Sequence, residues 1–241
     1  MLLWILISVI IVSLIAFVGI FFLAFKEKFL KKILILFIAL ASGALLGGAF
    51  FHLIPESLEL GIGKVSLYII GGILIFFVLE KFLYWRHCHK GKCPVHTFRY
   101  TILIGDALHN FIDGLIIAAA YLINIGLGIT TTIAIILHEI PQEIGDFGVL
   151  VYGGFKKGRA MLYNFFSALT AILGALVGYF LSASIDTTFL LPFAAGGFIY
   201  IAATDLIPEL HKRIKISESL LQLIFILVGL ALMWLLKCGC F

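Results

Sequence analysis

Charge is scarce in this sequence, because Asp, Glu, Lys and Arg together make up only 12% of its 241 residues. Hydrophobic residues take up 63% of the chain, well above the roughly 45–50% that is usual in soluble domains. This composition excludes an ordinary soluble domain. Since about 20 consecutive apolar residues make one helix that spans a bilayer, the sequence predicts an all-α integral membrane protein.

The N-terminus lacks both a basic stretch and a small-residue cleavage site. We therefore expect the first apolar segment to be kept as a helix and not removed as a signal peptide. The apolar runs predict eight transmembrane helices in a single domain over residues 1–241, at about 2–25, 33–58, 65–84, 99–123, 127–152, 160–182, 188–210 and 218–236. They divide the chain into helices one to three at 1–85, a loop at 86–98, helices four and five at 99–152, and helices six to eight at 160–237.

Lysine and arginine are nearly absent from every second connection between these helices. Of the 17 basic residues, 15 lie in the other connections, and the two exceptions are Lys64 and Lys237. Connections rich in Lys and Arg stay in the cytoplasm, so both termini are predicted to lie outside. The net charge of +4 then reflects membrane orientation, and we expect no nucleic-acid partner.

Cysteine is also sparse, with four residues in the chain. Cys88 and Cys93 fall in the predicted cytosolic loop, where thiols stay reduced, and the sequence indicates no function for Cys238 and Cys240. A disulfide framework is therefore not expected. The loop combines two thiols with three imidazoles, which can bind Zn²⁺, although a merely polar loop would fit as well. Its candidate ligands are His87, Cys88, His89, Cys93 and His96.

The most informative feature is a short pattern that recurs four times inside apolar segments. Each copy carries two ligand-type side chains four residues apart, on one face of a helix. Ionisable side chains are costly in lipid and usually face a functional interior. A proline in three of the copies also frees the carbonyl four residues before it. The copies begin at His52, His109, His138 and Asp205 and read HLIPE, HNFID, HEIPQ and DLIPE.

The first and last copies are nearly the same sequence in helices two and seven, which run in opposite directions. This is typical of the inverted repeats of secondary transporters. We predict a 3+2+3 arrangement, in which helices one to three and six to eight are the repeats and helices four and five form a central pair. By depth, His52 and Glu56 are expected at an entrance from outside, and Asp205, Glu209 and His211 at an exit to the cytosol.

Helices four and five carry the densest set of ligand-type residues. His109 and His138 each lie about eleven residues into a helix, or about 16 Å deep and near the midplane. No Lys or Arg occurs between Arg99 and Lys156 to neutralise the carboxylates, so the set predicts a bound cation; a web of hydrogen-bonded or protonated groups is the alternative. Imidazole with carboxylate suits Zn²⁺, Fe²⁺, Mn²⁺ or Co²⁺ better than Na⁺ or Ca²⁺.

In these two helices the sequence resembles the ZIP (Zrt/Irt-like) family of divalent-metal transporters. HNFIDG from His109 is similar to the helix-four signature, and HEIPQEIGD from His138 is similar to the branch whose fifth helix reads His-Glu-x-Pro-His-Glu-x-Gly-Asp. The resemblance covers essentially the whole chain. It implies movement of Zn²⁺, often also Fe²⁺ or Mn²⁺, into the cytoplasm, with the metal as substrate and no separate cofactor. It implies metal ligands at His109, Asn110, Asp113, His138, Glu139 and Gln142.

The sequence departs from the family pattern at two points. Gln142 stands where the branch has a second histidine, and an amide oxygen is a weaker zinc ligand, so broader selectivity or lower affinity is expected. The acidic side chain that some members supply from helix six for a second metal is missing, with Asn164 as its best polar substitute. The candidate second site comprises Glu143, Asn164 and Asp146. The expected setting is the lipid bilayer of the plasma membrane, with a homodimer as candidate assembly.

Two other functions fit parts of the sequence. HEIPQ resembles the HExxH motif of zinc metalloproteases, which intramembrane proteases also use, but Gln142 removes the second imidazole that this motif needs. A metal sensor that does not transport would need one site, whereas the four copies predict an entrance, a centre and an exit. We therefore expect a transporter without enzymatic activity.

Overall fold

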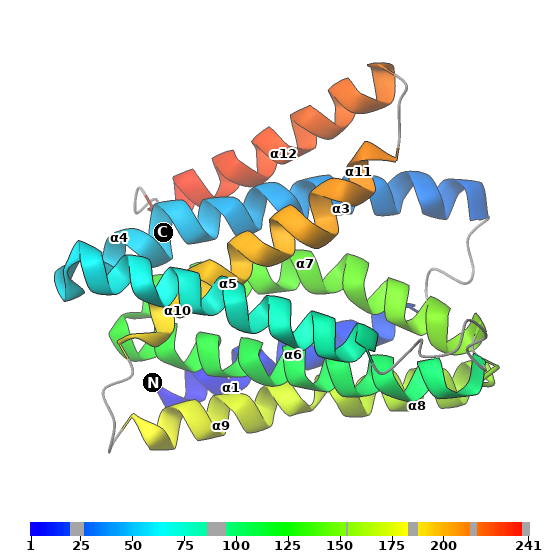
Figure 1. Ribbon diagram of the computed structural model, residues 1–241, viewed down its shortest axis with the longest axis horizontal. Helices are drawn as coiled ribbons and strands as arrows, with labels where there is room; N and C mark the ends of the chain where they lie inside the picture. The colour runs from blue at the N-terminus through cyan, green and yellow to red at the C-terminus, as the bar shows by residue number, and fades with distance from the viewer. Residues whose placement is uncertain (20–26, 86–94, 153, 183–187, 213–215, 238–241) are drawn as a thin grey trace.

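The computed structural model describes residues 1–241 except 20–26, 86–94, 153, 183–187, 213–215 and 238–241. Its described residues are helical nearly throughout, and no strand occurs among them. Figure 1 shows long helices lying roughly side by side, so the predicted all-α class is confirmed.

The helices follow one another with short connections. The first half holds α1 (Leu2–Leu14), the 3₁₀ turn η1 (Ile15–Phe17), α3 (Glu27–Gly47), η2 (Gly48–Leu53), α4 (Ile54–Ser57), the 3₁₀ turn η3 (Leu58–Leu60), α5 (Ile62–Trp85) and α6 (Val95–Ile123). The second half holds α7 (Ile125–Tyr152), α8 (Lys157–Ala168), α9 (Thr170–Leu181), α10 (Leu190–Ile201), η4 (Ala202–Leu206), α11 (Ile207–His211) and α12 (Ile216–Lys237).

Seven helical spans among the described residues are long and apolar enough to cross a membrane. They are Lys32–Leu60, Ile62–Lys81, Leu103–Ile123, Ile125–Val151, Lys157–Leu181, Leu190–His211 and Ile216–Lys237. The first predicted helix appears as the shorter apolar stretch Leu2–Phe17, and its predicted end at residue 25 lies outside the described residues. The start of α1 and the end of α12 lie toward the same end of the bundle (Figure 1).

The helices pack in two groups. The α6–α7 group consists of α1, α6, α7, α8 and α9, and its most extensive contact joins α6 to α9. The α3–α12 group consists of α3, α5, α10 and α12, in which α3 packs on α12 and α5 on α10. The groups meet chiefly where α3 lies against α7.

Glycines allow the closest helix pairs to approach. A Cβ atom added at Gly43 would clash with the Ile226 carbonyl on α12, and one added at Gly174 would clash with the Phe111 carbonyl on α6. Both glycines belong to the small-xxx-small spacing that lets membrane helices approach closely. Packing without room for a side chain therefore fixes the position of α6 relative to α9.

Helices two and seven share a further structural feature. Each contains a π-helical segment, η2 (Gly48–Leu53) in one and η4 (Ala202–Leu206) in the other, and each segment ends directly before an Ile-Pro pair. If helices one to three correspond in order to helices six to eight, the α3·α12 pair corresponds to the α10·α5 pair, and both are extensive contacts. The two correspondences match the predicted order of helices in the two repeats, and the inverted arrangement itself stays a prediction.

Predicted boundaries differ most from the structure in the second, fourth and sixth helices. Helix α3 begins at Glu27 and not at 33. Helix α6 begins at Val95 and not at 99, so the last four residues of the predicted loop 86–98 are helical. The predicted sixth helix is divided at Leu169 into α8 and α9. Helix α7 continues through Pro141, whereas the other two motif prolines each follow a π-helical segment.

Candidate metal centre

Two helices bring four ligand-type side chains to one point. His109 and Asp113 lie one turn apart on α6, and His138 and Glu139 are neighbours on α7. Each residue offers one ligand atom, and the four atoms lie within 4.8 Å of one another. These are four of the six residues that the family resemblance implies as metal ligands.

The spacing of these atoms suits a small divalent ion. The two imidazole Nε2 atoms are 3.1 Å apart, and Asp113 Oδ2 lies 3.2 Å from His138 Nε2 and 3.6 Å from His109 Nε2. Glu139 Oε1 lies 3.3 Å from His109 Nε2 and 3.6 Å from His138 Nε2. A tetrahedral Zn²⁺ with ligands at about 2.0–2.2 Å has ligand–ligand edges of about 3.3–3.6 Å. The four atoms therefore lie nearly as far apart as a bound Zn²⁺ requires.

The carboxylates of this group are buried with few partners. Asp113 and Glu139 are fully buried, and no oxygen of either has a hydrogen-bond partner among the described residues. Their close cationic or polar neighbours are the two histidines. Buried carboxylates are costly unless they are paired or coordinate a metal, so the group calls for a cation or for protons.

The imidazole rings are held in place by their surroundings. His138 Nδ1 lies 3.2 Å from the Ala134 carbonyl oxygen one turn earlier, which suits donation to that carbonyl and leaves Nε2 free to bind metal. Phe76 on α5 packs edge-on against His109 with ring centres 6.3 Å apart, and Phe198 on α10 packs against His138 at 6.1 Å. The α3–α12 group therefore contacts the metal-ligand side chains of the α6–α7 group directly.

The two predicted amide ligands lie beside this group. Asn110 is buried, and its Nδ2 donates to the backbone oxygen of Asp106 at 3.2 Å and to Asp106 Oδ1 at 2.8 Å. Its Oδ1 has no partner among the described residues and is the atom it could offer to a metal. Gln142 is half-buried and neighbours the Asp106 carboxylate.

The predicted second site forms a cluster deeper toward α8. Asn164 Nδ2 donates to Glu143 Oε2, while Glu143 Oε1 and Asn164 Oδ1 are buried without partners among the described residues. Asp146 is half-buried one turn along α7. The sequence analysis did not find Ser167, whose hydroxyl donates to Asp106 Oδ2. The sequence feature that could have identified Ser167 is its position three residues after Asn164, which places both side chains on one face of the helix.

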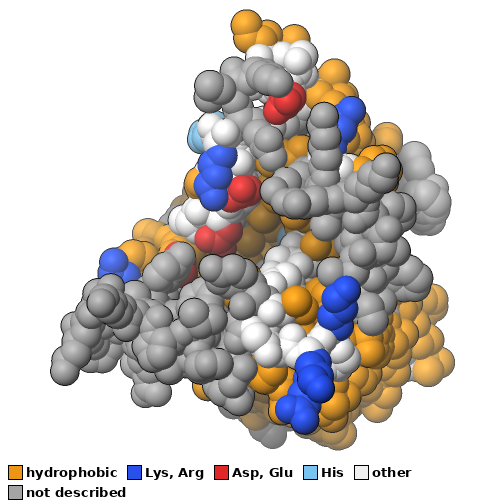
Figure 2. Space-filling model, turned by 90° about the vertical axis from the view of Figure 1, so that its right-hand side faces the viewer, with side chains coloured by type: hydrophobic (Ala, Val, Ile, Leu, Met, Phe, Trp, Pro, Cys, Tyr) orange, Lys and Arg blue, Asp and Glu red, His pale blue; other side chains and the backbone are white. Residues whose placement is uncertain are grey.

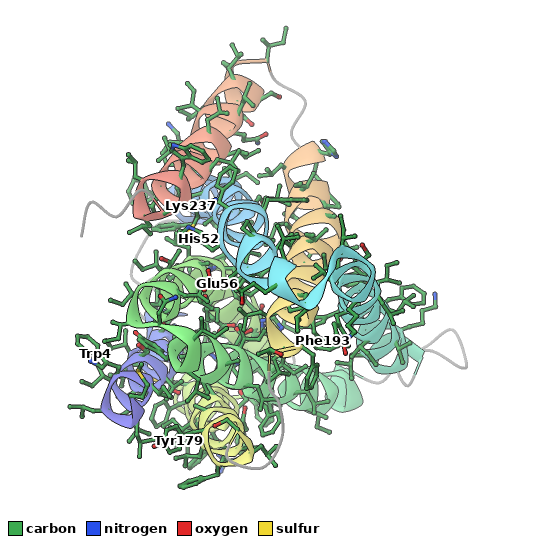
Figure 3. The ribbon with its side chains drawn as sticks, turned by 90° about the vertical axis from the view of Figure 1, so that its left-hand side faces the viewer. Trp4, His52, Glu56, Tyr179, Phe193 and Lys237 are labelled. Atoms are coloured by element: carbon green, nitrogen blue, oxygen red, sulfur yellow. The ribbon has the colours of Figure 1, made fainter. Side chains whose placement is uncertain are left out.

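The residues of the predicted entrance do not form one site. His52 is buried, and its Nε2 lies 2.7 Å from the Met233 carbonyl oxygen on α12. Glu56 instead accepts a hydrogen bond of 3.4 Å from Asn124, between α6 and α7. Figure 3 shows His52 next to the helix that carries Lys237 and Glu56 farther toward the α6–α7 group. A π-helical segment closes hydrogen bonds over five residues, so the four-residue stacking of a regular helix does not hold there.

The residues of the predicted exit do not form one site either. Asp205 is exposed, and Thr204 Oγ1 lies 3.2 Å from its Oδ1, whereas Glu209 forms an ion pair with Lys212. His211 is exposed and lines a separate cleft beside α12.

A further acidic residue at this end was not predicted. Glu80 on α5 accepts a hydrogen bond from the Tyr200 hydroxyl on α10. The two residues are 120 positions apart, so no local pattern could link them.

The predicted loop ligands are only partly within reach of the structure. His87, Cys88, His89 and Cys93 lie outside the described residues. His96 belongs to the first turn of α6.

The fold and the site define a class: a multi-pass membrane protein with a buried group of metal-ligand side chains between its central helices. A family model described as ZIP Zinc transporter matches residues 86–237. The chain belongs to this family of zinc transporters.

Individual relatives agree with the family match. The chain is 31% identical to the zinc transporter zipt-7.1 of Caenorhabditis briggsae, over 87% of this chain and 71% of the relative. It is 34% identical to the zinc transporter ZIP13 of Pongo abelii, over 81% of this chain and 64% of the relative. It is 29% identical to the zinc transporter SLC39A7 of Rattus norvegicus, over 86% of this chain and 65% of the relative. The chain thus spans less than two thirds of the length of the last two relatives.

Proposed function

We propose that the protein carries divalent transition-metal ions into the cytoplasm, with Zn²⁺ as the first substrate and Fe²⁺ or Mn²⁺ as alternatives. The observation that carries this proposal is the buried group of His109, Asp113, His138 and Glu139, whose four ligand atoms lie within 4.8 Å. Membership of a zinc transporter family supports the choice of ion. Asn110 and Gln142 complete the candidate ligand set from the same two helices.

We propose that the bundle end carrying Lys81, Lys156 and Lys212 faces the cytoplasm. Figure 2 views this end, and Lys and Arg side chains are scattered over it. Most basic residues of the sequence belong to connections at this end, and such connections stay inside. Both termini then face outward across the plasma membrane.

The two motif copies differ in exposure at their first ligand-type residue, which is His52 in helix two and Asp205 in helix seven. This difference supports an inward-facing state. At the outer copy, His52, Leu53 and Ser57 are buried. At the inner copy, Thr204 and Asp205 are exposed. We propose that metal reaches the cytosol past Asp205 and that the outer copy opens in an alternate state.

We propose that the cluster of Glu143, Asn164 and Asp146 is a weaker second site. Asn164 supplies a neutral amide, and its Nδ2 is already committed to Glu143. A metal held here would meet two carboxylates, as in the four-residue group, but an amide in place of the two imidazoles. Because imidazole favours zinc, full double occupancy is not expected.

The structure adds no support to the two alternative functions, an intramembrane metalloprotease and a metal sensor. The imidazoles of the metal group come from two different helices, His109 from α6 and His138 from α7. The HExxH motif of metalloproteases requires both imidazoles on one helix. A sensor would not need an exposed acidic copy on one side of the metal group.

Uptake into proteoliposomes tests the proposal. Purified protein is reconstituted, and uptake of Zn²⁺, Fe²⁺ and Mn²⁺ is measured separately. We expect His109→Ala to abolish uptake, because it removes one of the four ligands, and Glu59→Gln to leave it unchanged, because Glu59 is exposed and lies outside the metal group. Wild-type uptake by folded His109→Ala would refute the assigned site, and no uptake of any of the three ions by the unaltered protein would refute transport.

A further inference from the structure

A cleft lies between α11 and α12 at the bundle end that we place in the cytoplasm. Its volume is about 210 Å³. Figure 1 shows α11 and the start of α12 next to one another at this end. Three aliphatic and three polar side chains of the lining matter here: Ile207, Leu223, Ile226, His211, Ser219 and Gln222.

Gln222 is the unusual residue of the cleft. It sits in an otherwise apolar part of α12, only 6% of its surface is exposed, and its Nε2 has no hydrogen-bond partner among the described residues. An unsatisfied buried amide costs about 1–3 kcal/mol. A donor held at that cost beside an open cleft indicates a ligand that carries a hydrogen-bond acceptor.

The surroundings restrict what this ligand can be. The neighbouring α12 residues Leu220, Leu223 and Ile224 are more than half exposed, which on a transmembrane helix means contact with lipid chains. His211 lies on the opposite side of the cleft, at the bundle end over which Lys and Arg side chains are scattered (Figure 2), and the next residue, Lys212, is paired with Glu209. Basic pockets between helices at the cytoplasmic side of a membrane are suited to anionic lipid head groups.

We propose that this cleft binds an anionic phospholipid of the cytoplasmic leaflet. Gln222 Nε2 donates to a phosphate oxygen, His211 contributes a second polar contact, and an acyl chain lies along Leu223 and Ile226. The lipid would connect α11, which follows the inner Ile-Pro pair, with α12. The choice of leaflet rests on the orientation proposed above, but the binding itself does not depend on transport, because none of the four residues of the buried metal group takes part in it.

Native mass spectrometry of the purified full chain in detergent tests the site without any metal. Phosphatidylglycerol and phosphatidylcholine with the same acyl chains are titrated separately. We expect tighter binding of phosphatidylglycerol. Gln222→Leu should weaken it about tenfold, as loss of a hydrogen bond to a charged group would.

Two further variants complete the test. His211→Ala alters an exposed side chain and should also weaken phosphatidylglycerol binding, while Ser217→Ala, at the exposed start of α12, should not. Equal binding of both lipids, or unchanged binding by folded Gln222→Leu and His211→Ala, would overturn the proposal. Inorganic phosphate that binds as tightly as phosphatidylglycerol would also overturn it, because the acyl chain would then contribute nothing.

Discussion

Replacing Glu139 by glutamine removes one negative charge from the metal group with almost no change in volume. Both Glu139 oxygens are buried without hydrogen-bond partners among the described residues, so the substitution breaks no hydrogen bond there. It leaves Asp113 as the last carboxylate among the four ligands. We expect the Glu139→Gln protein to fold, and to be at least as stable as the unaltered protein when metal is absent.

The expected loss is a loss of zinc-induced stabilisation, and it appears when metal is added. Mutation of a residue that only hydrogen-bonds to a metal ligand lowers the metal affinity about 10–100-fold, so loss of a charged ligand should lower the zinc affinity at least about 100-fold. A ligand at 100 times its Kd stabilises a protein by about 2.7 kcal/mol. With a Kd that is 100-fold higher, the same zinc concentration would give only about 0.4 kcal/mol.

Thermal unfolding in detergent measures this difference, with tryptophan fluorescence followed at several zinc concentrations. The unaltered protein and Glu59→Gln, which changes an exposed carboxylate outside the group, should both show a clear rise in Tm with zinc. Glu139→Gln should show almost none. A zinc-induced rise of full size in Glu139→Gln would refute the assignment of Glu139 as a ligand.

Three other expectations follow from the same structure. Gln142→His should raise the preference for Zn²⁺ over Mn²⁺ in competition uptake, because imidazole favours zinc; an unchanged ratio would mean that residue 142 does not face the metal. Gly174→Ala should lower the stability by about 1–3 kcal/mol through its clash with α6, whereas Gly145→Ala, with nothing within 4 Å of its new Cβ, should not; equal unfolding temperatures would contradict the packing. In a cysteine-free background, Asp205→Cys should react with a water-soluble thiol reagent at least about ten times faster than His52→Cys, because residue 205 is exposed and residue 52 buried; the reverse order would contradict the inward-facing state.

The sequence predicted the metal group because its geometry is local to two regular helices. His109 and Asp113 are four residues apart on α6, and both helices are regular at these positions, so a four-residue spacing places side chains together. The remaining step, the meeting of α6 with α7, required only that the most polar faces of two apolar helices turn toward one another. That step follows from the cost of charge in lipid.

The entrance and exit pairs were less predictable for a specific reason. The sequence analysis treated His52 with Glu56, and Asp205 with Glu209, as stacked pairs on regular helices. Both pairs begin in a π-helical segment, whose wider turn changes which side chains share a face. In these two helices the proline follows a break, whereas α7 continues through Pro141, so neither the presence nor the kind of a break can be read from proline alone.

Contacts between distant helices lay outside what a sequence pattern can give. The Tyr200–Glu80 hydrogen bond and the Ser167–Asp106 hydrogen bond each join helices that are far apart in the chain. Only the packing of α5 on α10 and of α6 on α8 and α9 brings these groups together. Such pairs can be predicted only once the fold is known, whereas the candidate metal ligands can be predicted from two consecutive helices.

The two Ile-Pro motifs link the repeat to a mechanism. They have nearly the same sequence and the same π-helical start, yet His52 is buried with its Nε2 2.7 Å from the Met233 carbonyl oxygen, whereas Asp205 is exposed. Sequences related by inverted repeats can exchange such environments. The π-helical segments are the natural places for this exchange, because their backbone hydrogen bonds already depart from the regular helix. At the bundle end opposite Asp205, the hydrogen bond from Asn124 to Glu56 joins the two helix groups. Under the alternating access that we propose, this contact is expected to differ between the two states.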